Sequence, residues 1–159
     1  MHRIAFLAFD GFNLLDLAGP LEVTHTATLL GADPPSPGGG HAADGGVDGA
    51  VDRSDRGRGY ATVVATLDGR PVRSSSGVTV AADVALADCG PLDTLVVLGG
   101  LGAAAAGADP ELRAGLARAA RQAGRTASVC TGAMVLAAAG LLDGYQATTH
   151  WSSCDELAA

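Results

Sequence analysis

Lysine is absent from this chain of 159 residues, so all ten basic residues are arginine. There are 17 acidic residues, and the formal net charge is −7 at pH 7. An acidic surface repels the phosphates of nucleic acids. The chain alone is therefore a poor candidate for binding DNA or RNA.

Cysteine and histidine are also scarce, with three and four residues respectively. Cys89, Cys130 and Cys154 form no close pair, and neither a CxxC nor an HxxxH spacing occurs, so we expect neither a disulfide framework nor a metal site. The apolar run near the N-terminus, "IAFLAF", is too short for a signal peptide or a membrane span. We expect a cytoplasmic protein with reduced thiols and with no cofactor or membrane partner.

The chain does contain an alternation of short apolar runs and longer helical patterns. Strands are predicted at 3–9, 60–67, 93–100, 125–130 and 145–150, and helices at 13–30, 109–124 and 131–142. Residues 69–88 predict a short strand, a polar turn and a second strand that leads into a helical turn. Asp109 as N-cap and Pro110 in the first turn mark the start of the helix at 109–124, with Leu112 and Leu116 on one face. This order predicts one α/β domain with a mainly parallel sheet covered on both faces.

One long segment interrupts this alternation. Residues 31–59 consist of glycine, proline, aspartate and arginine with hardly any large apolar side chain. Such a segment cannot bury enough surface to offset the entropy lost on ordering. We therefore expect a disordered surface insertion at about 31–59.

Three features fall at the predicted carboxyl ends of strands, which is where parallel α/β sheets place their sites. They are Gly99–Gly100, Cys130 and His150. Cys130 stands between a strand and a helix, as in the nucleophile elbow of hydrolases, and a helix N-terminus favours the thiolate. His150 is the candidate proton partner, and the backbone amides of Gly100 and Thr131 are the candidate oxyanion pocket.

Structural interpretations compete with this one. Buried cysteine behaves as a small hydrophobic residue, a lone histidine at a strand end is commonly structural, and Asp16 near a helix start is typical of a cap. The stretch "LGGLGAAAA" also contains a G-x-G-x-x-A pattern (Gly100, Gly102, Ala105), which is found in dinucleotide sites. The next predicted strand ends in cysteine, however, and not in the acidic residue that would hold a ribose. We do not predict nucleotide binding.

Several stretches together resemble one family. They are "FDGFNLLDLAGPLEV", "PVRSSSGVTVAAD", "DTLVVLGG", "SVCTGAMVLAAAGLLDGYQATTHW" and "CDELAA". These are similar to sequences of the DJ-1/PfpI superfamily, whose members share a class I glutamine amidotransferase-like, flavodoxin-like fold, a three-layer sandwich. Within it the chain resembles the N-terminal, ligand-sensing domain of AraC/XylS-type transcription regulators of the GlxA kind. Isocyanide hydratases are similar too, through "LDLAGP" and "VCTG".

The resemblance implies roles for the candidate residues. Cys130 is then the elbow nucleophile, Asp16 the acidic residue that approaches its sulfur, and Gly100 and Thr131 the oxyanion pocket. His150 stands where many members keep a histidine. The resemblance also implies a homodimer and a small-molecule ligand.

The chain departs from the family pattern at its end. Regulators of this type continue with further core elements and with two helix-turn-helix motifs. We therefore expect a single domain over 1–159 that lacks its C-terminal part, from a regulator truncated before its DNA-binding module. The first hypothesis is a non-catalytic sensing domain. The alternative is a hydratase or hydrolase in which Cys130 attacks an electrophilic carbon while Asp16 or His150 moves the proton. A third possibility is a redox or stress-response role through oxidation of Cys130.

Overall fold

A five-stranded parallel sheet forms the centre of the protein. The computed structural model describes residues 1–31 and 59–158, so the predicted disordered insertion lies almost wholly outside the described residues. The sheet has the order β5-β2-β1-β6-β7, and every neighbouring pair runs parallel. Its strands are β1 (His2–Leu7), β2 (Tyr60–Thr66), β5 (Val84–Ala85), β6 (Leu92–Val97) and β7 (Ala123–Ser128). A small antiparallel hairpin, β3 (Val72–Arg73) and β4 (Thr79–Val80), stands apart from this sheet.

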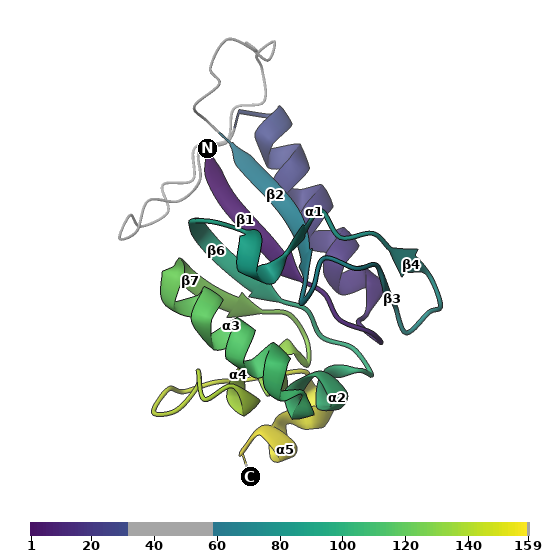
Figure 1. Ribbon diagram of the computed structural model, residues 1–159, viewed down its shortest axis with the longest axis vertical. Coiled ribbons are helices and arrows are strands. Elements are labelled where there is room, and N and C mark those ends of the chain that lie inside the picture. Colours follow the sequence, from purple (N-terminus) through teal and green to yellow (C-terminus); the bar gives the residue numbers. More distant parts are fainter. Residues whose placement is uncertain (32–58, 159) are drawn as a thin grey trace.

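Helices cover both faces of the sheet. They are α1 (Leu14–Leu29), α2 (Ala103–Ala108), α3 (Pro110–Gln122), α4 (Gly132–Ala138) and α5 (Cys154–Ala158), with 3-10 turns at Leu86–Asp88 and Trp151–Ser153. From the central strand β1 the chain first moves to β2 on one side and later to β6 on the other. Because such crossovers are right-handed, this reversal puts α1 and α3 on opposite faces (Figure 1). The predicted three-layer α/β fold is confirmed.

The core lies along β1 and β6. Ile4 to Leu7 of β1 are all buried, and so are Ala8 and Phe9, which follow the strand. This is the burial expected of a strand with helices on both faces. The core positions the loops after β1 and β6, which carry the first parts of the candidate site.

The start of α3 follows local sequence rules. Asp109 accepts hydrogen bonds from the amides of Glu111 (2.8 Å) and Leu112 (3.3 Å), and Pro110 occupies the first turn. Leu112 and Leu116 are buried beneath the helix. The predicted cap and buried face are confirmed.

Two predictions near the C-terminus are wrong. The helix predicted at 131–142 ends at Ala138, because Gly140 takes a φ of 72° and its amide donates to the carbonyl of Ala137 in a C-terminal cap. The strand predicted at 145–150 does not form, and this segment is a mainly exposed loop. Its β-favouring composition did not decide the conformation, since strand propensity depends strongly on context, and the segment does not pair with the edge strand β7. The Thr149 side chain instead bonds to the carbonyl of Cys130.

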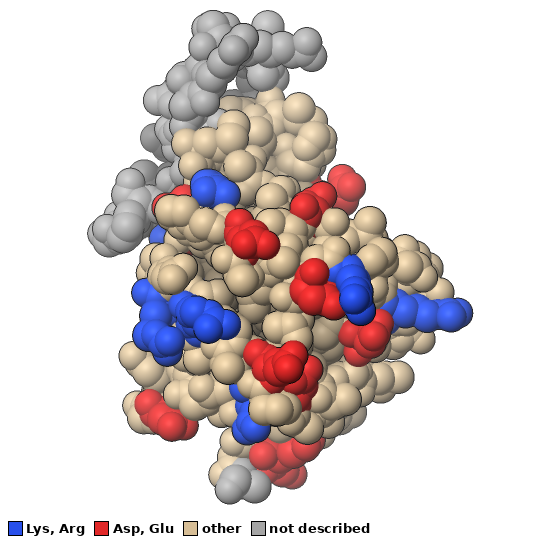
Figure 2. All heavy atoms as spheres, viewed as in Figure 1, with Lys and Arg blue, Asp and Glu red and all other residues tan. Residues whose placement is uncertain are grey.

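Charge is distributed without an extensive basic surface on the face shown in Figure 2. Acidic side chains are spread across it, and the basic ones form one group at the left, with others at the right edge and near the bottom. Among residues 1–31 and 59–158, no helix has the length and apolarity to cross a membrane.

Candidate functional site

Cys130 lies in the tight turn between β7 and α4. Strand β7 ends at Ser128 and α4 begins at Gly132, whose amide closes the turn on the carbonyl of Val129 at 2.9 Å. Cys130 has a φ of 54°, the one positive value for a non-glycine residue in the described part of the chain. A left-handed conformation costs an ordinary side chain about 1–2 kcal/mol and persists where the surroundings impose it.

The absence of a side chain at Gly132 makes this turn possible. A Cβ atom there would collide with the backbone carbonyls of Val97 and Leu98 at the end of β6. The first turn of α4 can therefore lie directly against the neighbouring strand. Cys130 is half-buried, and its side chain lies so close to Gly99, in the loop after β6, that a Cβ on that glycine would collide with it.

Asp16 reaches this turn from the first turn of α1. Asn13 caps that helix, with its side chain accepting from the amide of Leu15 at 3.0 Å. The cap is therefore Asn13 and not Asp16, which is only 8% exposed. The Asp16 carboxylate accepts a hydrogen bond from the Gly99 amide (3.1 Å), and the Cys130 side chain interacts with the same carboxylate.

Burial dominates the ionisation of Asp16. Removal from water raises its pKa above the ordinary value of 3.8. The hydrogen bond from Gly99, the interaction with Cys130 and the charge of His150 lower the pKa and only reduce this rise. The site thus holds a carboxyl group with increased proton affinity against a thiol.

Gly100 and Thr131 meet, but not as two free amides. The Gly100 amide donates to the Thr131 hydroxyl at 2.9 Å, and that hydroxyl donates to the Gly100 carbonyl at 3.2 Å. Gly100 has a φ of 139° and lies so close to the loop after β1 that a Cβ would collide with backbone atoms of Gly11, Phe12 and Asn13. An anion that used the Gly100 amide would first have to displace the Thr131 hydroxyl.

His150 comes close to the turn from a loop, not from a strand end as predicted. The preceding Thr149 donates its hydroxyl to the carbonyl of Cys130 at 3.0 Å, which holds this segment beside the turn. The His150 side chain is half-buried, and its Nδ1 lies 2.8 Å from the Ser152 hydroxyl. Its charge acts on Asp16. The structure thus places all five predicted site residues in one region.

Sequence reasoning missed two contributors to this region. Gly99 was noted only as part of a glycine pair, yet its amide binds Asp16. Thr149 carried no functional signal at all, although it joins the C-terminal loop to Cys130. Both act through contacts between distant segments, which no local pattern encodes.

A cavity of about 400 Å³ lies beside the turn, between α2, α4 and the C-terminal segment. Gly100 and Thr131 are among the residues that line it, together with several small side chains. It therefore shares residues with the candidate site.

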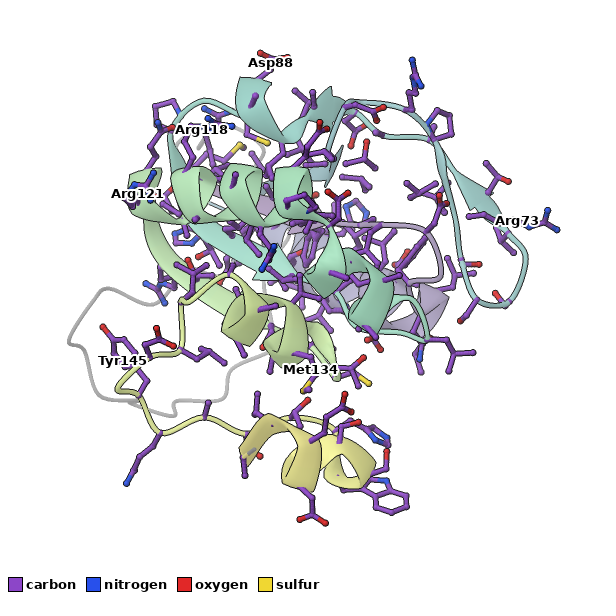
Figure 3. All side chains as sticks on the ribbon, turned by 60° about the horizontal axis from the view of Figure 1, so that its bottom comes forward. Arg73, Asp88, Arg118, Arg121, Met134 and Tyr145 are labelled. Carbon is purple, nitrogen blue, oxygen red and sulfur yellow. The ribbon has the colours of Figure 1, made fainter. Side chains whose placement is uncertain are left out.

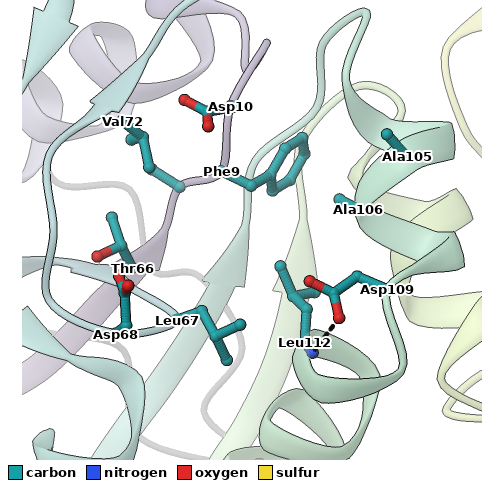
Figure 4. A pocket seen from close by; sticks show the side chains of 11 residues that line it. Phe9, Asp10, Thr66, Leu67, Asp68, Val72, Ala105, Ala106, Asp109 and Leu112 are labelled. Carbon is teal, nitrogen blue, oxygen red and sulfur yellow. Dashed lines mark hydrogen bonds between the residues drawn. The ribbon is translucent and has the colours of Figure 1, made fainter.

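Another cavity, of about 280 Å³, opens where β1 and β2 end (Figure 4). Asp10, Asp68 and Asp109 stand around it, but each already accepts a hydrogen bond from a backbone amide. The described residues contain no group of three potential ligands that could hold a metal ion. These carboxylates therefore have structural roles in turns and caps.

Comparison with known proteins identifies related sequences along the whole chain. The DJ-1/PfpI family model matches residues 2–159. An uncharacterized protein encoded 5′ of cpoL in Streptomyces lividans is 42% identical over 157 residues, which are 99% of this chain and 93% of that protein. The HTH-type transcriptional regulator GbdR of Pseudomonas aeruginosa is 32% identical over 149 residues, 93% of this chain and 34% of the regulator. Isonitrile hydratase of Pseudomonas putida is 42% identical over 87 residues, 55% of this chain and 38% of the enzyme.

Solved structures agree with the sequence matches. A ThiJ/PfpI family protein from Pseudomonas syringae superposes with a TM-score of 0.74 at 29% identity, covering 99% of this chain and 53% of that one. An AraC family transcriptional regulator from Pseudomonas putida gives a TM-score of 0.68 at 26% identity, covering 99% of this chain and 71% of the regulator. The chain therefore spans about a third to a half of several of the proteins it matches.

Proposed function

Since this chain belongs to the DJ-1/PfpI family, we propose that it binds a small molecule beside Cys130 and serves as a sensing domain of the kind found in AraC-type regulators. This proposal rests on the share of the chain that matches a transcription regulator. The match to GbdR runs along 93% of the chain, whereas the match to isonitrile hydratase covers 55%. We assign no DNA contact to these 159 residues, whose formal net charge is −7. DNA recognition would fall to a module outside them.

The geometry beside Cys130 is compatible with binding without turnover. The Gly100 amide, a candidate donor to a developing oxyanion, is already taken by the Thr131 hydroxyl. An enzyme gains rate from donors that are preorganised toward the charge of the transition state. A ligand that only binds needs no such free donor.

A thermal-shift screen of small molecules, followed by thiol mapping, tests the proposal. The three cysteines differ in exposure, since Cys89 is buried, Cys130 half-buried and Cys154 exposed. We expect a compound that raises Tm, remains unchanged in solution by NMR, and protects Cys130 but not Cys154 from iodoacetamide. Conversion of the bound compound, or equal protection of both thiols, contradicts the sensing role.

A second function, cysteine-dependent hydration, is favoured by one observation. The Cys130 side chain interacts with the Asp16 carboxylate. With an isocyanide, the sulfur would bond to the terminal carbon, and one proton, taken from the thiol and relayed through Asp16, would reach that same carbon. Water would then add and release the sulfur, so that the products are an N-substituted formamide and the original thiol.

Cyclohexyl isocyanide distinguishes the two functions. If the chain is a hydratase, the formamide accumulates in the NMR spectrum, and Cys130→Ser abolishes its formation. Asp16→Asn then also slows the reaction, whereas Cys154→Ser has no effect. If no formamide forms above the rate in buffer, the hydratase alternative is wrong.

We also propose that the chain forms a homodimer through α1. The supporting observation is the exposure of Leu15 (72%), Val23 (68%) and Leu30 (69%), large apolar side chains in or next to this helix. Analytical ultracentrifugation of a Leu15→Glu, Val23→Glu double variant should show a monomer. Tyr145→Glu, at a comparably exposed position outside α1, is the control and should remain dimeric. A wild-type protein that sediments as a monomer contradicts the proposal.

A further inference from the structure

We propose that the cavity between α2, α4 and α5 is the ligand chamber of this site, and that it takes a small apolar molecule bearing a positively charged group. The inference rests on the proposed binding function and adds the place and chemical class of the ligand. It is argued from what lines the cavity and from what adjoins it. We call this cavity the α2–α4 chamber.

Small side chains create the α2–α4 chamber. Ala104 and Gly107 of α2 face Ala138 of α4, and none of the three fills the space between the helices. At Gly107 the helices come close, since a Cβ there would lie 3.1 Å from the Cβ of Ala138. About 400 Å³ remains open, a volume within the range of small-molecule sites.

The interior of the chamber is mainly apolar. Met134 extends from α4 into the space between α4 and α5 (Figure 3). Leu101 also lines the chamber, although it is 89% exposed. A methionine side chain adapts its shape to the molecule beside it. These walls favour a hydrocarbon body in the ligand.

The charge of one lining residue indicates which polar group the ligand carries. Among the described residues that line the chamber, Glu156 of α5 is the only ionisable one, and none is basic. A carboxylate or phosphate in the ligand would meet this negative charge without a compensating cation. An ammonium group would be attracted to it, and the Ser153 hydroxyl nearby offers an acceptor.

The chamber also adjoins the Cys130 turn directly. Gly100 and Thr131, which are hydrogen-bonded to each other, form part of its wall. A molecule in the chamber therefore touches the residue that follows Cys130. A molecule bound in the chamber can therefore affect the conformation of the Cys130 turn without forming a covalent bond to the thiol.

Three probes of similar size and different charge test this inference. They are cyclohexylammonium, cyclohexanol and cyclohexanecarboxylate, each titrated into the full chain. The chain has two methionines, Met1 and Met134, so a methyl-labelled sample gives one resonance inside the chamber and one outside it. We expect the Met134 resonance to shift with millimolar affinity in the order ammonium, alcohol, carboxylate. The ammonium should bind about three- to tenfold more tightly than the alcohol, as for a partly exposed ion pair.

Two variants and one control locate the binding. Glu156→Gln should remove the preference for the ammonium and leave alcohol binding unchanged. Ala104→Leu should fill the chamber and abolish the shift for all probes. Ala105→Leu is the control, because Ala105 is the next residue of α2 but lines the other cavity, at the ends of β1 and β2. This variant should bind the probes like the wild type.

The outcomes separate this inference from the proposed function. No Met134 shift with any probe, tighter binding of the carboxylate, or an equal effect of the two alanine substitutions overturns the inference. If a screened compound still protects Cys130 in the Ala104→Leu variant, the sensing role stands and its ligand lies elsewhere. If the probes bind as expected but no compound protects Cys130, the chamber exists and the sensing role at Cys130 fails.

Discussion

The Cys130 side chain interacts with the Asp16 carboxylate, although the two residues lie in the turn after β7 and in the first turn of α1. The Gly99 amide binds the same carboxylate at 3.1 Å. Loops following three neighbouring strands of the sheet thus meet at one buried acidic group. The packing of these loops around Asp16 affects the stability of the protein in ways that can be measured.

The first prediction concerns Asp16 and pH. Because burial raises its pKa, the folded protein binds the proton more tightly than the unfolded chain does. The stability from this group is fully present below the ordinary pKa of 3.8 and is lost as pH rises through the raised value. Asp16→Asn avoids burying a charge and keeps an acceptor for Gly99. We expect this variant to unfold about 2 °C higher than the wild type near neutral pH, with no advantage in acid.

Asp93→Asn provides a control of opposite sign. The hydrogen bond from the Arg3 amide lowers the pKa of Asp93, so its stabilising effect is present above the ordinary value and is lost as pH falls through the lowered one. This variant should be less stable near neutral pH and equal to the wild type in acid. Thermal unfolding followed by circular dichroism across the acidic to neutral range measures both. A Tm difference for Asp16→Asn that does not change with pH contradicts the prediction.

The second prediction concerns the backbone at Cys130. Its φ of 54° is strained for any residue with a side chain and unstrained for glycine. Cys130→Gly and Cys130→Ala both remove the thiol, so they differ mainly in this strain. We expect the glycine variant to be more stable than the alanine variant by about 1 kcal/mol in urea unfolding. Equal stability would show that the turn relaxes to a negative φ.

The third prediction concerns Gly132. A Cβ at this position collides with the carbonyls of Val97 and Leu98, which belong to the backbone and cannot rotate away. Gly132→Ala should therefore cost about 2–3 kcal/mol. Gly19→Ala in α1 is the matched control, because nothing lies within 4 Å of the added atom, and it should gain about 0.5–1 kcal/mol. Similar effects of the two substitutions would rule out the close approach of α4 to β6.

The fourth prediction concerns the Thr131 hydroxyl. Thr131→Val removes the acceptor of the Gly100 amide and should destabilise the protein by about 1–2 kcal/mol. Thr131→Ser retains the hydroxyl and should restore most of that loss. Hydrogen exchange at the Gly100 amide gives a local measurement, with faster exchange expected in the valine variant only. Unchanged exchange in the valine variant would exclude this hydrogen bond.

Local patterns were sufficient for most of the helices and strands. The cap at Asp109, for example, acts through the amides of the residues that follow it. Two segments near the C-terminus could not be predicted from local patterns. Residues 145–150 have the composition of a strand but do not pair with the edge strand β7, and α5 is too short and too exposed to leave a periodic pattern.

The candidate site, too, could be predicted only in part from local sequence patterns. Cys130 could be selected from its place between a predicted strand and a predicted helix. That the Gly99 amide binds Asp16, and that Thr149 binds the carbonyl of Cys130, could not be found this way. Each of these bonds joins elements that are far apart in the chain, and their proximity depends on the strand order of the sheet.

By itself, the sequence determined an α/β domain with a parallel sheet, because hydrophobic periodicity and capping are encoded over a few residues. It also determined that Cys130 lies in a strand-to-helix turn. Only the tertiary structure decided what surrounds that thiol. The order β1-β6-β7 brings the loops of three strands together, and the burial of Asp16 among them sets both its proton affinity and its contact with Cys130.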